Sequence, residues 1–277
     1  MTPTSIETPN KAYSRHYVLG LGFNGFHRIN YLEWGTQDAA NKRTLFCVHG
    51  LTRNARDFDY FAQSLCEDYH LVCPDVVGRG DSDHLTTDEG YNYLQYNADM
   101  NAVMARLNVT EVDWIGTSMG GIIGMVLAAM PQSPIRRLVV NDIGPEVPRD
   151  ALDSIAKYIG LSGDFDNMKQ AEDYLRKIYP EFSPMTDEDW EHLTKYSVRR
   201  ARTGRVRLKV DPRVGDAFRD SIAYFNSDMW DVWERITCPV LVLRGKDSSF
   251  LTEGIANKML TVGPETTMVE FDGVGHT

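Results

Sequence analysis

A serine flanked by glycines, between a predicted strand and a predicted helix, constrains this chain more than any other feature. The sequence GTSMG at 116–120 follows an apolar run at 112–115 and precedes a helix-like apolar run at 122–130. A turn this sharp strains the serine backbone and leaves no room for side chains two residues before and after it, which glycine permits. It would expose the Ser118 hydroxyl and aim the N–H groups of the next helix at any group that Ser118 attacks.

The pentapeptide alone also fits a glycine-rich helix entry that serves only packing, so its context has to decide. Over the first half of the chain, strand patterns alternate with helix patterns, which favours βαβ units and a parallel sheet. The opening strands form a predicted hairpin over 18–34, with Asn24-Gly25 as its turn. Further strands are predicted at 44–48, 70–73, 112–115 and 135–140, and helices at 56–66 and 91–107.

This alternation stops after Gly144-Pro145 and resumes at 239–243 and 267–271. The segment between is mostly polar and helical in its spacing, with helices predicted at 150–159, 168–178, 186–202 and 214–236. We therefore predict an α/β core formed by residues 1–145 and 237–277, with a helical cap, or lid, at 146–236.

Composition and charge restrict the classes of partner and cofactor that we expect for this protein. The chain has 277 residues and a formal net charge of −10, which gives no electrostatic footprint for nucleic acid or an anionic membrane. The polar segment 1–10 reads as a loose tail without the features of a signal peptide, and we expect a cytoplasmic protein. Its four cysteines form no C-x-x-C pair or Cys/His cluster, so we expect reduced thiols, no metal and no cofactor.

A serine nucleophile needs a base, a carboxylate that orients the base, and N–H donors for an oxyanion. His276 follows the last predicted strand and comes after both Ser118 and the candidate acids in the chain. Asp247 directly follows the strand at 239–243 and is the favoured acid, while Asp142 follows the strand at 135–140 and is the rival. Loops at the carboxyl ends of parallel strands share one edge, so these groups can converge.

The loop after the strand at 44–48 supplies candidate N–H donors. We predict that the backbone N–H groups of Leu51 and Met119 form an oxyanion hole, with the His49 side chain shaping the loop. Arg53 and Asn54 are candidates to bind a substrate carboxylate or carbonyl, although helix capping and surface charge explain them equally well.

These motifs together resemble those of the α/β-hydrolase-fold superfamily, over nearly the whole chain. The matching features are His49-Gly50, DVVGRGDS at 75–82, GTSMGG at 116–121, Gly245-Lys246-Asp247 and Gly275-His276. The resemblance implies a mostly parallel eight-stranded sheet with helices on both faces, a helical cap insertion and a Ser118–Asp247–His276 triad. It also implies that 75–82 is a structural loop beside the site.

Within the superfamily, the chain is similar to small-molecule hydrolases such as enol-lactonases, carboxylesterases and meta-cleavage-product hydrolases. The last group usually carries a tryptophan directly after the catalytic histidine, where this chain has Thr277. The family fold also continues into a helix after this histidine, whereas this sequence stops at Thr277. We predict a serine hydrolase that cleaves a small ester or lactone through an acyl-enzyme on Ser118. Alternatives are carbon–carbon bond hydrolysis or cofactor-free peroxidation on the same triad, and a non-enzymatic binding module; a homodimer is left open.

Overall fold

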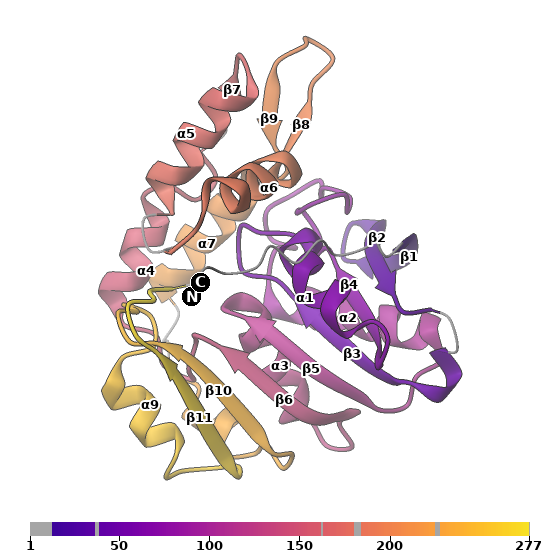
Figure 1. Ribbon diagram of the computed structural model, residues 1–277, viewed down its shortest axis with the longest axis vertical. Helices are drawn as coiled ribbons and strands as arrows, with labels where there is room; N and C mark the ends of the chain where they lie inside the picture. Colours follow the sequence, from indigo (N-terminus) through magenta and orange to yellow (C-terminus); the bar gives the residue numbers. More distant parts are fainter. Residues whose placement is uncertain (1–12, 37–38, 162, 180–183, 225–227, 277) are drawn as a thin grey trace, which may run out of the picture.

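An eight-stranded sheet forms the centre of the molecule (Figure 1). The computed structural model describes residues 13–36, 39–161, 163–179, 184–224 and 228–276, so the tail predicted at 1–10 and Thr277 lie outside the described residues. The strand order is β1-β2-β4-β3-β5-β6-β10-β11. The strands are β1 (Ser14–Gly22), β2 (Gly25–Trp34), β3 (Arg43–Val48), β4 (Tyr69–Pro74), β5 (Val112–Thr117), β6 (Ile135–Asn141), β10 (Val240–Gly245) and β11 (Thr266–Phe271).

The sheet is mostly parallel. Strands β1, β2 and β4 pair antiparallel at one edge, and every pairing from β4 to β11 is parallel. The turn between β1 and β2 contains Asn24, as the sequence predicts. The predicted fold class is thus confirmed.

Helices cover both faces of the sheet because alternate side chains of the buried strands point to opposite sides. In β3, Phe46 and Val48 join one hydrophobic core, whereas Leu45 and Cys47 join the other. The first core includes residues of α2 (Tyr93–Leu107), α3 (Met119–Ala128) and α9 (Glu253–Met259). The second includes residues of the 3₁₀ helix η2 (Ala55–Phe58) and of α1 (Asp59–Leu65). A further 3₁₀ turn, η1, spans Ala39–Asn41.

The segment between β6 and β10, residues 146–236, is called the insertion below. Its helices are α4 (Arg149–Ala156), α5 (Met168–Ile178), α6 (Asp187–Ser197), α7 (Arg213–Tyr224) and α8 (Trp230–Trp233). It also contains a small antiparallel sheet in the order β7 (Asp164–Phe165), β9 (Val206–Leu208), β8 (Val198–Arg200).

This small sheet corrects the prediction of one helix over 186–202. Helix α6 ends at Ser197, and the chain continues directly as β8. Val198 and Val206 are buried together with Phe165, and this packing stabilises the extended conformation of these short strands. Gly204, at φ 82°, closes the turn between β8 and β9.

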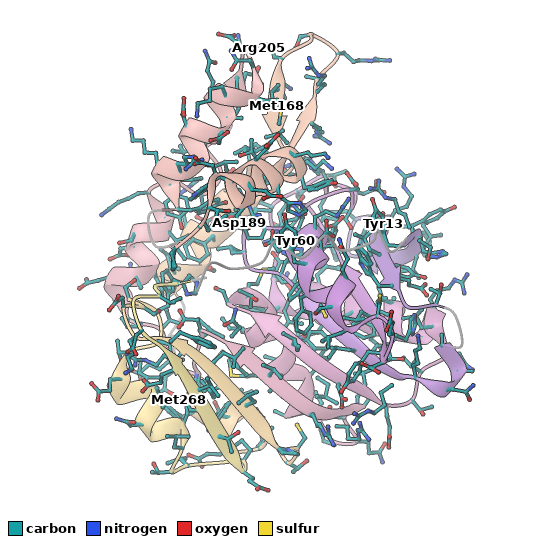
Figure 2. The ribbon with its side chains drawn as sticks, in the orientation of Figure 1. Tyr13, Tyr60, Met168, Asp189, Arg205 and Met268 are labelled. Atoms are coloured by element: carbon teal, nitrogen blue, oxygen red, sulfur yellow. The ribbon has the colours of Figure 1, made fainter. Side chains whose placement is uncertain are left out.

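The insertion lies over the carboxyl ends of the parallel strands of the core sheet (Figure 1). Its helix α6 lies nearest to α1. In Figure 2, Tyr60 of α1 and Asp189 of α6 mark this boundary, while Arg205 lies at the outer tip of the small sheet. The described helices include none that is both long and apolar enough to cross a membrane. All four cysteines are free thiols.

Candidate active site

Ser118 occupies a strained turn between β5 and α3. Its backbone has φ 49° and ψ −114°, a left-handed conformation that a non-glycine residue rarely adopts. A Cβ atom on Gly116 would lie 2.1 Å from the carbonyl oxygen of Gly120, and one on Gly120 would lie 2.0 Å from that of Val48. The prediction that glycines are required two residues before and after Ser118 is therefore confirmed.

His276 connects Ser118 to a carboxylate. Its Nε2 lies 3.0 Å from Ser118 Oγ, and its Nδ1 lies 2.8 Å from Asp142 Oδ2. The ring of Phe250 stacks on the imidazole at a centroid distance of 3.8 Å and an interplanar angle of 20°. With its hydrogen on Nδ1 facing the carboxylate, the imidazole presents an unprotonated Nε2 to the serine hydroxyl and can accept its proton.

Asp142 is held in place from several directions. It follows β6 at φ 52° and is 1% exposed. The Gly245 N–H donates to its Oδ1 at 3.0 Å, and the Ser248 hydroxyl donates to its Oδ2 at 2.5 Å. These donors satisfy the buried carboxylate and leave Oδ2 directed at His276.

The prediction that Asp247 pairs with His276 is corrected by this geometry. Asp247 is exposed, and its backbone N–H donates to the Val274 carbonyl at 2.9 Å. The end of β10 and the loop after it therefore support the histidine loop and supply Gly245 and Ser248 to Asp142, while the residue directly after β6 supplies the carboxylate. Asp142, the alternative acid considered from the sequence, is the carboxylate that faces His276.

The loop that follows β3 is fixed next to Ser118. A Cβ atom on Gly50 would lie 3.7 Å from Ser118 Cβ. The His49 side chain is fully buried; its Nε2 accepts the Val76 N–H at 3.0 Å, so its Nδ1 carries the hydrogen and donates to the Gly50 carbonyl at 2.7 Å. Burial lowers the pKa of His49 to about 3, which keeps the ring neutral.

A buried arginine holds the next peptide group. Arg79 Nε donates to the Leu51 carbonyl at 2.9 Å, and its Nη1 donates to Tyr96 Oη at 3.0 Å. Arg79 belongs to the loop 75–82, so this loop lies beside the site and supports it, as the resemblance implies. Within the described part of the chain, the N–H groups of Leu51 and Met119 have no protein acceptor and remain available to a ligand.

A cavity of about 480 Å³, the active-site cavity, opens above Ser118 and His276. Core loops and the insertion both line it. Its apolar lining residues are Leu51, Phe58, Phe61, Ile115, Ile155, Met185, Leu193 and Leu243. A site of this size and character suits a small organic ligand with an apolar part.

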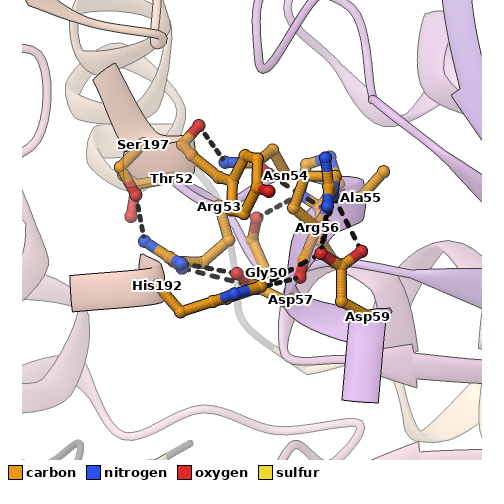
Figure 3. Close-up of polar contacts among 12 residues, drawn as sticks. Gly50, Thr52, Arg53, Asn54, Ala55, Arg56, Asp57, Asp59, His192 and Ser197 are labelled. Carbon is orange, nitrogen blue, oxygen red and sulfur yellow. Dashed lines mark hydrogen bonds and ion pairs between the residues drawn. The ribbon is translucent and has the colours of Figure 1, made fainter. Parts of the chain in front are cut away.

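Arg53 and Asn54 differ in their relation to this cavity, and Figure 3 shows the polar contacts of both. Arg53 lines it, but its guanidinium is paired with Asp57 and donates to Ser197 Oγ at 2.8 Å. Asn54 caps η2 through the Arg56 N–H and donates to the Tyr196 carbonyl at 3.2 Å, and it does not line the cavity. Both side chains therefore tie the core loop to the last turn of α6.

Two further groups, one at this junction and one beside His276, were not singled out by sequence patterns. His192 of α6 lies 3.3 Å from the Arg56 carbonyl and 3.3 Å from Asp59 Oδ2 (Figure 3). Phe250, which stacks on His276, follows β10 in a loop whose position no local pattern predicts. Among the described residues, no group of three or more His, Cys, Asp or Glu side chains could hold a metal ion.

Comparisons with known proteins agree with this architecture. The family model for the α/β hydrolase fold matches residues 43–277. The 3-hydroxybutyrate-oligomer hydrolase of Cupriavidus necator is 43% identical over 259 residues, covering 91% of this chain and 88% of that protein. Esterase YbfF of Escherichia coli is 24% identical over 254 residues, covering 90% and 92%. A solved α/β hydrolase from Novosphingobium aromaticivorans superposes with a TM-score of 0.85 at 31% identity, covering 96% and 92%.

Proposed function

Because this chain belongs to the α/β-hydrolase fold family, we propose that it is a serine hydrolase that cleaves a small carboxylic ester through an acyl-enzyme on Ser118. The observation that carries the proposal is the hydrogen-bonded series from Ser118 Oγ through His276 to Asp142, at 3.0 and 2.8 Å, on the floor of a cavity. The esterase and hydrolase relatives support ester hydrolysis as the reaction.

In the first half of the reaction, His276 Nε2 takes the proton of the Ser118 hydroxyl as Oγ attacks the ester carbonyl carbon. The carbonyl oxygen becomes an oxyanion, which accepts hydrogen bonds from the N–H groups of Leu51 and Met119. His276 then gives its proton to the alcohol oxygen, the carbon–oxygen bond breaks, and the alcohol leaves an acyl-enzyme behind.

In the second half, water replaces the alcohol. His276 takes a proton from the water as its oxygen attacks the acyl carbon, and then returns a proton to Ser118 Oγ as the carboxylic acid leaves. Asp142 remains a carboxylate throughout and stabilises the imidazolium that forms twice in each cycle. Asp142 takes the role that the sequence analysis gave to Asp247.

The relative in Cupriavidus necator, whose name gives oligomers of 3-hydroxybutyrate as its substrate, supports a substrate class for this chain. We propose a short ester of a hydroxy acid, linear or as a lactone, for this chain. The apolar wall of the active-site cavity suits the short alkyl part of such an ester. The insertion acts as a cap that closes this cavity and chooses among acyl groups.

The experiment that tests the proposal combines substitution and labelling at Ser118. Purified protein and Ser118→Ala are assayed on p-nitrophenyl esters, the 3-hydroxybutyrate dimer, a lactone and a dienoate ketone. We expect ester hydrolysis by the parent and a loss of kcat of roughly 10³-fold or more in the variant. A serine-reactive phosphonate should add its mass to the peptide that contains Ser118. Label on another peptide, full activity of the variant, or turnover of the dienoate ketone alone would contradict the proposal.

A further inference from the structure

The hairpin of β1 and β2 forms one edge of the core sheet, far from the edge formed by β11 (Figure 1). Helix α2 packs on one face of this hairpin. A Cβ atom on Gly20 would clash with Asp99 of α2, and one on Gly22 would lie 2.8 Å from Gln95 Oε1. The residues of β1 that alternate with these glycines point to the opposite face, where they are more than half exposed.

The exposed face and the tip of the hairpin are apolar, and are called the hairpin patch below. The patch consists of Tyr17, Leu19, Leu21, Phe23 and Phe26, which are 56–97% exposed. Leu21 and Phe26 lie directly opposite each other in the register of the two strands, and Phe23 lies in the turn that joins them. Soluble proteins rarely leave a contiguous apolar surface of this kind in water, and such patches mark interaction sites.

Strand β1 lacks the features that usually protect an edge strand from other chains. Its nine residues contain no proline and no lysine, and they pair with β2 in one continuous register without a bulge. In the described part of the chain, no strand pairs with its outer side. A long, apolar and unprotected edge strand is a template for another protein surface.

Ion pairs of both signs border the hairpin patch. Arg15 lies 2.8 Å from Asp81, which also pairs with Lys209 at 2.7 Å. Arg28 of β2 lies 3.0 Å from Asp83. An apolar centre within a polar rim is the usual composition of a protein–protein interface. Because the rim contains both arginines and aspartates, a second copy of the same surface meets opposite charges as well as like ones.

The size of the hairpin patch is compatible with an interface between two copies. A Tyr or Phe side chain offers roughly 150–250 Å² of surface, so Tyr17, Phe23 and Phe26 together expose about 350–600 Å². With Leu19, Leu21 and the outer side of β1 included, two patches in contact would bury on the order of 1,200 Å² in total. This area reaches the lower end of the range for specific interfaces.

We propose that the hairpin patch binds the same patch of a second copy of this chain, related by a two-fold axis, to form a homodimer. In such an interface the patch is its own complement, so the apolar centres meet and an arginine of one rim can face an aspartate of the other. None of the patch residues lines the active-site cavity, so each copy keeps its own complete site. The inference goes beyond the proposed function and does not depend on it.

Sedimentation velocity of the parent and of three variants tests the dimer. We expect the parent to associate within a range of about 1 to 100 μM, and Leu19→Lys and Leu19→Glu each to raise Kd at least tenfold, because they place like charges at the centre of the interface. Val269→Lys is the matched control, because Val269 is 45% exposed on β11, the strand at the opposite edge of the sheet. A parent that stays monomeric, or Leu19 variants that associate as the parent does, would overturn the inference.

A mixing experiment distinguishes a second copy from another occupant of the patch. Leu19→Lys and Leu19→Glu are mixed in equal amounts, and we expect a mixed dimer whose Kd is at least tenfold lower than that of either variant alone, because opposite charges then meet. Thermal unfolding of each variant should match the parent, since Leu19 is exposed. A mixture as monomeric as its components would overturn the symmetric contact. A monomeric parent that binds phosphatidylcholine vesicles through Leu19 would assign the patch to a lipid surface and refute the dimer.

Discussion

Asp142 is the residue on which the orientation of His276 depends. The carboxylate is buried, receives hydrogen bonds from Gly245 and Ser248, and faces His276 Nδ1 at 2.8 Å. In Asp142→Asn, the amide can turn its NH₂ group toward Nδ1, which favours the tautomer with hydrogen on Nε2 and leaves no base for Ser118. We expect kcat on p-nitrophenyl butyrate to fall roughly 10³- to 10⁴-fold in this variant.

Asp247→Asn is the matched control for this prediction. Asp247 is exposed and contributes a backbone N–H to the site, which the substitution preserves. We expect kcat within about threefold of the parent value, and thermal unfolding measured for both variants shows whether a loss reflects unfolding. A larger loss of kcat in Asp247→Asn than in Asp142→Asn would show that Asp247, in the loop after β10, is the catalytic acid.

The choice between these two aspartates shows what sequence patterns can and cannot predict about a single residue. Both follow strands that end at the same sheet edge, so chain order and strand position allow either one. Burial and the direction of the side chain decide between them, and these depend on the positive φ of Asp142 and on donors from another loop. Ser118 and His276 were predictable because the glycines around Ser118 and the loop after the last strand are visible locally.

At the scale of an element, the loop after β3 is held in position by side chains rather than by regular secondary structure. His49 fixes the Gly50 carbonyl, and Arg79 fixes the Leu51 carbonyl. The N–H of Leu51 can act on an oxyanion only while these peptide groups keep their orientation. The stability of this loop should therefore depend on the neutral state of His49.

The pH dependence of unfolding tests the role of His49. Its pKa is about 6.5 in an unfolded chain and about 3 in the folded protein, so the unfolded state gains a proton first as the pH falls. The contribution of His49 is fully present above pH 6.5 and is lost progressively toward pH 3. Between pH 7 and pH 4.5 this loss amounts to about 3 kcal/mol of unfolding free energy. Urea unfolding at pH 7, 5.5 and 4.5 measures it.

His49→Gln should remove this part of the acid dependence, because glutamine does not titrate. The difference in unfolding free energy between parent and variant should shrink by about 3 kcal/mol from pH 7 to pH 4.5. His16→Gln serves as the control, since the His16 side chain is 40% exposed and lies on β1, away from the loop. If the unfolding free energies of the parent and of His49→Gln change by the same amount between pH 7 and pH 4.5, then His49 is not held neutral in the folded protein.

Elements of the insertion were harder to predict than those of the core sheet. The buried strands of the core carry continuous apolar runs that local patterns reveal, such as 44–48. Strand β8 has two arginines among its three residues and is extended because Val198 packs against Phe165 and Val206. The contact between Val198 and Phe165 joins chain segments more than 30 residues apart, which a local helical pattern cannot register.

At the scale of the whole molecule, the active-site cavity depends on how the insertion packs on the core. Arg53 reaches Ser197, Thr52 reaches Tyr179, and His192 reaches the carbonyl of Arg56. The sequence predicted an insertion at 146–236 and its helical character, but not the volumes beneath it. Cavity shape results from contacts between distant segments, so it follows from the three-dimensional packing rather than from any single motif.

The cap proposal predicts that a lining residue of the insertion sets acyl-chain preference. Met185 lines the active-site cavity, so Met185→Ala should lengthen the space for an acyl chain. We expect the ratio of kcat/KM for p-nitrophenyl octanoate over butyrate to rise roughly three- to tenfold, as one or two buried methylenes would produce. Initial rates on esters of four to ten acyl carbons measure this ratio.

Trp190→Phe is the control variant for this prediction. Trp190 is 7% exposed and packs with Leu175, Tyr179 and Leu193 inside the insertion, without lining the active-site cavity. Its replacement should lower the unfolding free energy by about 1 to 3 kcal/mol while leaving the octanoate-to-butyrate ratio within twofold of the parent. If Met185→Ala folds with parental stability and keeps the parental ratio, the insertion does not select the acyl group. Selection would then have to arise from core residues that also line the cavity, such as Leu51 and Phe61.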